Sequence, residues 1–418
     1  MMILFLSGVA GAAEVALPVI PDATFTITDY GAVGDGKTMN TDAIGKAIDA
    51  CKSAGGGIVV IPRGTFMTGP LQLGEKMNLR VDEDATLRFT DDFDAFPLSN
   101  NRHRHAIAGE GLSDIAITGK GTIDGNGAKW WTEFRKVKGT PDEKNQPRRP
   151  NLIDLTRCRR VLVQDVTISN SPMFHLVPRD CDDVTIEGAR FIAPEDAPNT
   201  DGIDPSGHNY LITRCHFDVG DDCIAVKPQR AAQGERLSCE DMLITDCTFL
   251  HGHGLSIGGQ TPGGLRRMTV RNCTFDGTDA GIRMKAPRGQ GGIVEDLTYE
   301  NITMTNVKVP ILITSYYPKI PADVENDSAQ PMAATTPIWR NIRISNLTSQ
   351  ASPIAGQIIG LPEMPVENVV LTNVKISAAK GMQIVNARAI KFESCQIDVR
   401  DGKPLITHNA DVIGMGQK

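Results

Sequence analysis

The sequence predicts an all-β protein built as a single parallel β-solenoid, with a helix capping its N-terminal end. Short segments of alternating apolar and polar residues recur along the chain at a spacing of roughly 21–32 residues. The chain contains 41 Gly and 25 Pro but only 5% aromatics, a composition typical of short strands joined by tight turns. Its 418 residues are also long for one compact core, whereas stacked coils lengthen their core with every repeat.

The chain begins with a short apolar segment. Residues 1–9 are too few to span a bilayer, and Ala10 and Ala12 have the spacing of a signal-peptidase site, although no Lys or Arg precedes them. We interpret residues 1–13 as a signal peptide, with a disordered cytosolic tail as the alternative. The protein is then expected to be secreted or periplasmic, with residues 14–418 forming one β-helix domain and no membrane helix.

The first regular element is predicted to be an amphipathic helix at residues 41–53. Asn40 or Thr41 would cap its start, and the glycines at 55–57 would end it before a strand at 58–61. A solenoid needs its end covered, and this helix can do so with one apolar face. That face consists of Ile44, Ala47, Ile48 and Cys51.

Each repeat contains two apolar alternations separated by a short polar step. The step holds Asn or Asp, and Asn tolerates the left-handed backbone that a sharp bend between strands requires. Stacked Asn side chains can also bond from coil to coil. The repeats lie at 113–123, 160–168, 182–191, 209–217, 241–249, 267–275, 295–304, 340–348, 367–376 and 388–397. Their step residues include Asn272, Asn301, Asn346 and Asn373, with Asp165 and Asp246 as substitutes.

Two insertions interrupt the repeats, and both read as loops, at 128–150 and 318–337. Insertions in solenoids tend to gather on one face, often the binding face. The nine cysteines are an odd number, and many fall at one repeated position, which favours core packing over disulfides or metal. Cys223 and Cys239 could pair across a loop, but this pairing is not favoured.

The net charge of −7 argues against nucleic acid as a partner, because phosphate binding needs a basic face. A negative surface would also repel a polyanion, so an acidic substrate would require a local basic patch.

Four motifs stand out from the repeats: NTDGID (199–204), GDDC (220–223), GHG (252–254) and RMK (283–285). They are about one coil apart, and residues one coil apart lie about 4.8 Å apart on one face. We therefore expect their side chains to stack in one line, with carboxylates, an imidazole and two cations forming an acid–base site beside a cationic clamp. The stacked residues would be Asp201, Asp221 or Asp222, His253, Arg283 and Lys285.

Each motif alone has an ordinary explanation. Asp201 could cap a turn, the pair Asp221 and Asp222 could be a solvated turn, and His253 could be a polar loop residue. His251 makes an H-x-H with it, but no further ligands of metal spacing follow. None of these ordinary explanations predicts that the motifs share a spacing of one coil. Because the Asp pair precedes its strand, strict alternation need not hold and both carboxylates can face one cleft.

In order and spacing the motifs resemble those of polygalacturonases, family 28 of the glycoside hydrolases, with their N-T-D, G/Q-D-D, G-H-G and R-I-K followed by Tyr. Met284 replaces the family Ile, and spacing favours Tyr317 over Tyr316 as the Tyr. The stretches DYGAVGDG (29–36) and GTIDG (121–125) are similar to the family's first coils, so the resemblance covers nearly the whole mature chain.

The resemblance implies a right-handed parallel β-helix that hydrolyses α-1,4-galacturonan with inversion and without a metal or other cofactor. Asp221 would be the general acid, Asp201 and Asp222 would activate water, and His253 would tune the acid's proton. The other implied site residues, which bind substrate or support the site, are Asn199, Asp204, Arg283, Lys285 and Tyr317. We expect a monomer that binds an acidic polysaccharide, and neither nucleic acid nor membrane.

The chemistry of inverting hydrolysis is consistent with the roles implied for these aspartates. Inversion needs one protonated and one ionised carboxyl roughly 6.5–9.5 Å apart. Three clustered Asp side chains resist full ionisation, so one of them stays protonated.

Three alternatives stay open at this point. One is hydrolysis of rhamnogalacturonan or xylogalacturonan, although rhamnogalacturonan enzymes lack the GHG histidine and the Asp pair present here. Another is a Ca²⁺-dependent β-helix pectate lyase, and a third is a non-catalytic glycan-binding solenoid. The choice between endo and exo attack depends on the loops at 94–104, 128–150 and 318–337.

Overall fold

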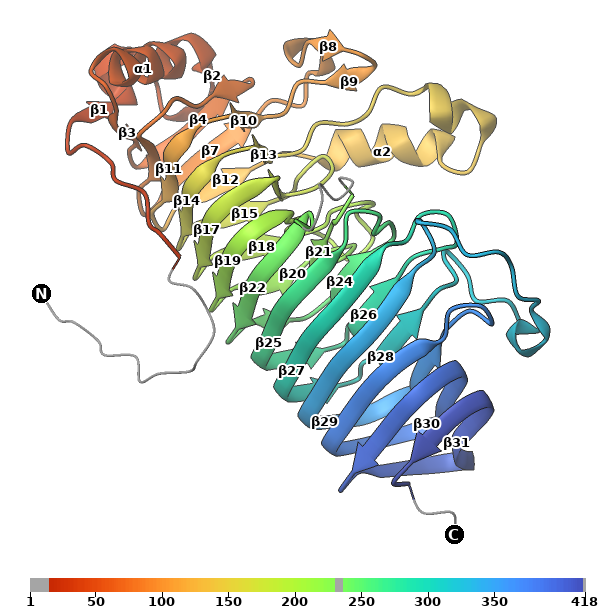
Figure 1. The fold of residues 1–418 in the computed structure, drawn as a ribbon. Helices are drawn as coiled ribbons and strands as arrows, with labels where there is room; N and C mark the ends of the chain where they lie inside the picture. The colour runs from red at the N-terminus through yellow and green to blue at the C-terminus, as the bar shows by residue number, and fades with distance from the viewer. Residues whose placement is uncertain (1–14, 230–235, 416–418) are drawn as a thin grey trace, which may run out of the picture.

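The computed structural model describes residues 15–229 and 236–415, so the signal peptide expected at residues 1–13 lies outside the described residues. The strands wind into an elongated parallel β-helix with α1 (Thr41–Ser53) at its N-terminal end (Figure 1). Within the described residues, no helix has the length and apolar character needed to cross a membrane.

The coils stack their strands into three parallel ladders. The longest consists of β1 (Thr24–Thr26), β3 (Gly57–Ile61), β6 (Met77–Val81), β11 (Ser113–Thr118), β14 (Arg159–Gln164), β17 (Cys181–Glu187), β19 (Gly207–Thr213), β22 (Cys239–Thr245), β25 (Leu265–Asp276), β27 (Ile293–Thr305), β29 (Ile338–Ile359), β30 (Val366–Glu393) and β31 (Gln396–Ile413). A second consists of β2 (Asp35–Met39), β4 (Gly64–Thr68), β7 (Ala85–Phe89), β12 (Thr122–Asp124), β15 (Thr167–Ser169), β18 (Arg190–Ile192), β20 (His216–Asp218) and β23 (Thr248–Phe249).

The third ladder carries the motifs, and we call it the site face. It consists of β5 (Leu71–Gln72), β10 (Ile107–Glu110), β13 (Ile153–Thr156), β16 (Leu176–Arg179), β21 (Ile224–Val226), β24 (Leu255–Gly258), β26 (Ala280–Lys285) and β28 (Val309–Thr314). Ile203 bridges β16 to β21 by pairing with Leu176 and Ile224. Consecutive motifs are thereby brought onto neighbouring strands.

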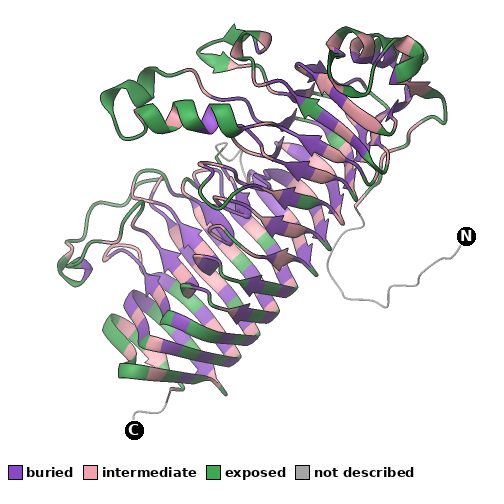
Figure 2. Cartoon of the chain, turned by 180° about the vertical axis from the view of Figure 1, so that it is seen from behind, coloured by how far each residue is buried: buried purple, intermediate pink, exposed green. Residues whose placement is uncertain are grey.

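The interior is a continuous column of apolar side chains, and Figure 2 shows buried and more exposed residues alternating along the strands. Identical positions of successive repeats lie in register, as the sequence predicts: Ile117, Val163, Ile186, Ile212, Ile244, Val270, Tyr299, Ile344 and Leu371. Four phenylalanines stack with centroids 4.4–5.1 Å apart, namely Phe191, Phe217, Phe249 and Phe275. The repeat pattern therefore specifies the register as well as the fold.

The asparagine ladder predicted at the polar steps is confirmed. Asn301 has φ +55° and donates to Asn272 at 3.1 Å, and it accepts from Asn346 at 3.1 Å. Asn373 continues the ladder with a 2.8 Å bond to Asn346. Each step residue thus turns the chain and also ties one coil to the next.

The capping helix is confirmed with the predicted limits, and its predicted apolar face is buried. Asn40 precedes it but makes no side-chain capping bond to it. Its amide donates instead to the carbonyls of Val33, Thr38 and Met67, and so it ties neighbouring turns together.

The interpretation of residues 128–150 as a loop is wrong for its first half, which forms α2 (Ala128–Val137). Trp130 and Trp131 of this helix are both buried, and Trp131 Nε1 donates to the Ser171 carbonyl at 2.9 Å. Burial of two indoles stabilises a short helix that its local sequence alone does not reveal. The short 3₁₀ turns lie at Ile27–Tyr30, Phe93–Ala95, Pro141–Asn145 and Val324–Asn326.

A hairpin of β8 (Leu98–Ser99) and β9 (Arg102–His103) lies on the same side as α2, toward the N-terminal end (Figure 1). The cysteines are free thiols, and all but Cys395 are buried. Cys223 and Cys239 therefore pack in the core without forming a disulfide.

Candidate active site

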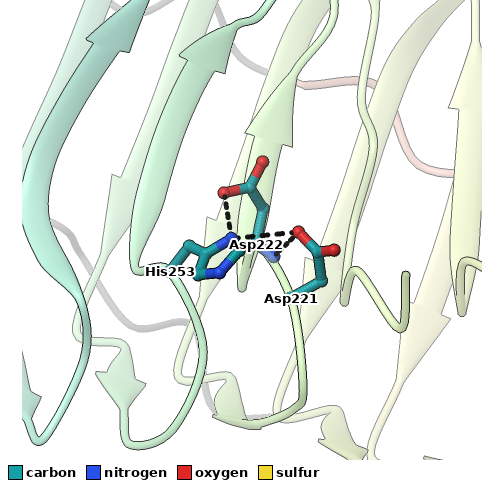
Figure 3. Close-up of side chains that lie close together, drawn as sticks. All are labelled: Asp221, Asp222 and His253. Carbon is teal, nitrogen blue, oxygen red and sulfur yellow. Dashed lines mark hydrogen bonds and ion pairs between the residues drawn. The ribbon is translucent and has the colours of Figure 1, made fainter. Parts of the chain in front are cut away.

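The two adjacent carboxylates of GDDC lie just before β21, because that strand begins at Ile224. Both side chains face the same imidazole (Figure 3). His253 Nδ1 lies 3.1 Å from Asp221 Oδ1 and 3.6 Å from Asp222 Oδ1. The turn frees them from strand alternation, as the sequence predicts, and allows two neighbours to share one partner.

The register corrects the prediction that all motif side chains stack in one line. The pairing of β21 with β24 places Asp222 beside His253. Arg283, however, pairs with Ser256, and Lys285 lies two residues further along the same strand. The backbones of these two cationic residues therefore lie further along their strand than the acid–base row, and only their long side chains reach back to it.

Asp222 is the buried anionic centre of the cluster. Its carboxylate accepts from Ser256 Oγ at 2.7 Å and from Arg283 Nη1 at 2.8 Å, and Lys285 Nζ lies 2.9 Å away. Burial raises the pKa of this carboxyl, but Lys285, His253 and Arg283 outweigh it and hold the pKa well below its usual range. Asp222 is therefore ionised, and both cations of the expected clamp are already paired with it.

Asp221 is the more accessible carboxylate of the pair, since its side chain is 22% exposed against 3% for Asp222. Burial raises its pKa, but the hydrogen bond from His253 brings it below the ordinary value. Burial lowers the pKa of His253, and the hydrogen bonds to both carboxylates raise it to about 9. At neutral pH the shared proton therefore resides on His253 Nδ1.

Asp201 and Asp204 form a second buried pair around a lysine. Lys227 Nζ lies 3.3 Å from Asp201 Oδ2 and 3.5 Å from Asp204 Oδ2. Burial, followed by the charges of Asp204 and Asp221, raises the pKa of Asp201 well above its usual range. Burial also raises the pKa of Asp204, to about 6. Asp201 therefore holds its proton to a higher pH than an ordinary aspartate does.

Lys227 is a site residue that the sequence reasoning missed. Burial lowers its pKa, but Asp204 and Asp201 outweigh this and leave the pKa raised. The signal was available, because Lys227 directly follows β21, the strand that begins after the Asp pair. Val226, directly before it, pairs with Ile257, which in turn pairs with Met284, the residue before Lys285.

Arg149 is a second missed residue, and nothing in its loop sequence marks it. Its buried guanidinium donates to the Pro172 carbonyl at 2.7 Å and to Asn199 Oδ1 at 2.7 Å, and it lies 4.0 Å from the Phe134 ring centroid. Because Arg149 holds the amide oxygen, Asn199 Nδ2 faces Asp221 Oδ2 at 3.4 Å. The predicted site residue Asn199 is thus oriented by an arginine.

Tyr317 lies at the edge of the cluster, with its ring centroid 5.3 Å from Lys285 Nζ. Gly259 leaves room for the ring, since a Cβ there would lie 2.6 Å from it. Tyr316 turns away and donates to Asp327 at 2.6 Å, so Tyr317 is the tyrosine that reaches the site. A cavity of about 470 Å³ lined by Arg283, Lys285 and Tyr317 continues from here along the site face.

Asp221, Asp222 and His253 also place three donor atoms within 4.8 Å of one another. Carboxylate oxygen and imidazole nitrogen are suitable ligands for a divalent cation. Arg283 and Lys285 already neutralise Asp222, however, and would repel a further cation. The donor set therefore fits a proton better than a metal, and the absence of a metal stays a prediction.

Several known proteins are similar to this chain over most of its length. A polygalacturonase from Juniperus ashei is 32% identical over 380 residues, covering 87% of this chain and 70% of that protein. An endo-polygalacturonase from Pectobacterium carotovorum subsp. carotovorum is 30% identical, covering 85% of this chain and 86% of that protein. The structure of a family 28 exopolygalacturonase from Yersinia enterocolitica matches 94% of this chain and 78% of that one, with a TM-score of 0.82 and 25% identity.

Structural neighbours of this kind are right-handed parallel β-helices, which confirms the predicted fold and handedness. The family model described as glycosyl hydrolases family 28 matches residues 51–395. Together with these relatives, that match shows that the chain belongs to family 28 of the glycosyl hydrolases.

Proposed function

We propose that the protein hydrolyses the α-1,4-galacturonosyl linkages of polygalacturonate or its oligomers by an inverting acid–base mechanism. The observation that carries the proposal is the accessible carboxylate of Asp221, bonded to a protonated His253 and adjacent to two buried acids, in a member of a glycosidase family. The relatives named polygalacturonase support this choice of substrate.

Asp221 acts as the general acid in this proposal, and its proton comes from His253. In the free protein the pKa of Asp221 is below its ordinary value, so the proton must move across the 3.1 Å contact when substrate binds. Substrate excludes water and adds its own carboxylates, and both effects raise the pKa of a neighbouring acid. Asp201 and Asp222 then hold the water that attacks from the opposite face.

Arg283, Lys285 and Tyr317 bind the acidic sugar next to the scissile bond. Arg283 keeps 17% of its side chain exposed while one nitrogen bonds Asp222, so the rest of its planar fork is free for a substrate carboxylate. Tyr317, at 38% exposed, offers an aromatic face to the sugar ring. Asn199 and Asp204 support this arrangement through Asp221 and Lys227.

Incubation with polygalacturonate tests the proposal. Hydrolysis releases reducing ends without the ultraviolet absorbance of an unsaturated product and survives a chelator, whereas a lyase gives the opposite result and a binding module releases nothing. Asp221→Asn is expected to abolish turnover with the melting temperature retained; near-normal activity of that variant contradicts the assignment. Product sizing after brief digestion separates endo from exo attack, and rhamnogalacturonan and xylogalacturonan serve as comparison substrates.

We further propose that residues 14–418 act as a single monomeric catalytic domain outside the cytoplasm. The continuous core from α1 to β31 supports one domain, since each coil is buried by its neighbours. Sedimentation of the purified protein checks the monomer, and fractionation of the producing cell checks the location.

A further inference from the structure

Arginines also gather on the N-terminal side of the catalytic carboxylates. Arg102 and Arg148 pair in a parallel bridge, so their side chains leave neighbouring backbone segments in the same direction. Arg179 ends β16, one strand before Asp201 in the stack. Burial, with the charges of Arg102 and Arg179, lowers the pKa of Arg148, as expected for cations held close together.

This cluster carries more positive charge than its protein partners neutralise. Asp154 is buried and already contacts Arg179 Nη2 at 3.3 Å, His105 Nε2 at 3.5 Å and Asn151 Nδ2 at 2.8 Å. Among the described residues, neither Arg102 nor Arg148 makes a side-chain hydrogen bond or an ion pair. Arg148 is half-buried, whereas Arg102 is exposed. A half-buried guanidinium without a protein acceptor is uncommon, because each donor lost from water needs a new partner.

Phe174 connects the cluster to the acid–base site. Its ring centroid lies 5.7 Å from Arg148 Cζ and 5.5 Å from Lys227 Nζ. Lys227 in turn contacts Asp201 at 3.3 Å, so Arg148 is separated from a catalytic carboxyl by one ring and one lysine. A ligand that spans the acid–base site toward the N-terminal end must pass beside Arg148.

We infer that Arg102, Arg148 and Arg179 form a second site for a uronate carboxylate, on the side of Asp201 opposite to Arg283 and Lys285. The inference rests on the proposed function, because it takes the ligand to be an oligomer with a carboxylate on each sugar. Guanidinium groups recognise carboxylates through paired N–H donors, and the two unpaired arginines provide them. Cationic positions then flank the acids on both sides, so sugars are held on both sides of the bond that breaks.

Calorimetry with trigalacturonate and longer oligogalacturonates tests this site. The measurements use an Asp221→Asn background, so that the ligand is not consumed. Arg148→Gln and Arg102→Gln are each expected to weaken binding about tenfold or more, the usual effect of losing a charged hydrogen bond. Arg63→Gln is the matched control, because it removes the same charge from an exposed position and should leave affinity unchanged.

Methyl-esterified oligomers distinguish a loss of carboxylate binding from a structural effect of the substitutions. Esterification removes the carboxylate charge, so the variants and their parent should then bind almost equally. Unchanged affinity of both variants for free oligogalacturonates overturns the inference, and so does an equal loss for the esterified ligands. If the wild-type protein releases no reducing ends, the proposed function fails, while calorimetry still decides whether these arginines bind a carboxylate.

Discussion

At the scale of single residues, the site is defined by where its protons lie. Three aspartates of the same intrinsic acidity differ because one contacts two cations, one contacts an imidazolium and one is buried beside other acids. The motifs identified the acids and the histidine from sequence alone. They could not identify Lys227 and Arg149, because a partner that reaches across coils is recognisable only once the register is known.

The roles of Asp221 and Asp201 can be separated by the leaving group. A general acid assists departure of the sugar oxygen, so its loss matters little for an aryl galacturonide whose phenolate leaves unaided. Asp221→Asn should therefore lose activity on polygalacturonate but recover much of it on the aryl substrate. Asp201→Asn should stay impaired on both, because water activation is still required.

The reverse pattern would assign the acid to Asp201, whose pKa is raised by burial and by the charges of Asp204 and Asp221. Initial rates on both substrates, with melting temperatures as the folding control, decide the question.

The pH dependence of stability should report His253. Its pKa is raised from an ordinary 6.5 to about 9, so its contribution to stability is complete below pH 6.5 and is lost as pH rises through about 9. Asp222 acts in the opposite direction, since its depressed pKa gives stability that is lost only on acidification below its ordinary value of 3.8. His253→Gln should flatten the decline of melting temperature between pH 6.5 and about 9; a variant with the wild-type slope would contradict this.

At the scale of elements, local repetition made the fold predictable. Each coil repeats the same alternation and the same left-handed step, so the core register follows from aligning the repeats. Insertions have no such template. The sequence predicts a loop where α2 forms, because the stability of this helix comes from burying Trp130 and Trp131 against distant residues, and a single sequence does not show that contact.

The asparagine ladder provides a test at this scale. Asn301→Ala removes two ladder bonds and places a residue that disfavours φ +55° at the step. Since the bonds are solvent-exposed, we expect a loss of about 1–2 kcal/mol in the free energy of unfolding, mostly from the backbone. Asn301→Gly keeps the backbone relaxed and should lose less. Urea titration measures both, and equal losses would show that the side-chain bonds dominate.

At the scale of the whole molecule, a chain of net charge −7 carries cations along one face of an otherwise acidic solenoid. The rest of the surface is acidic and repels a polyanionic substrate, whereas the cations of the site face attract it. The orientation of the approaching substrate is therefore selected at long range.

Salt should therefore weaken productive binding. Raising sodium chloride from about 0.1 M to about 1 M shortens the Debye length from ~10 Å to ~3 Å and screens exposed cations. The KM for polygalacturonate is expected to rise severalfold while kcat changes little, because the pair of Asp222 with Lys285 is buried. Steady-state kinetics over this range check it, and a constant KM would contradict electrostatic attraction.

The parallel ladder of the site face has one more consequence, which concerns length. Strand pairing separates Arg179 from Lys285 by four strand spacings, and at about 4.8 Å each these amount to about 19 Å. This distance is fixed, because the pitch of the coils is set by backbone hydrogen bonds. Affinity across a series of oligogalacturonates should therefore rise in a step at the first oligomer long enough to reach both Arg179 and Lys285, and it should level off for longer oligomers.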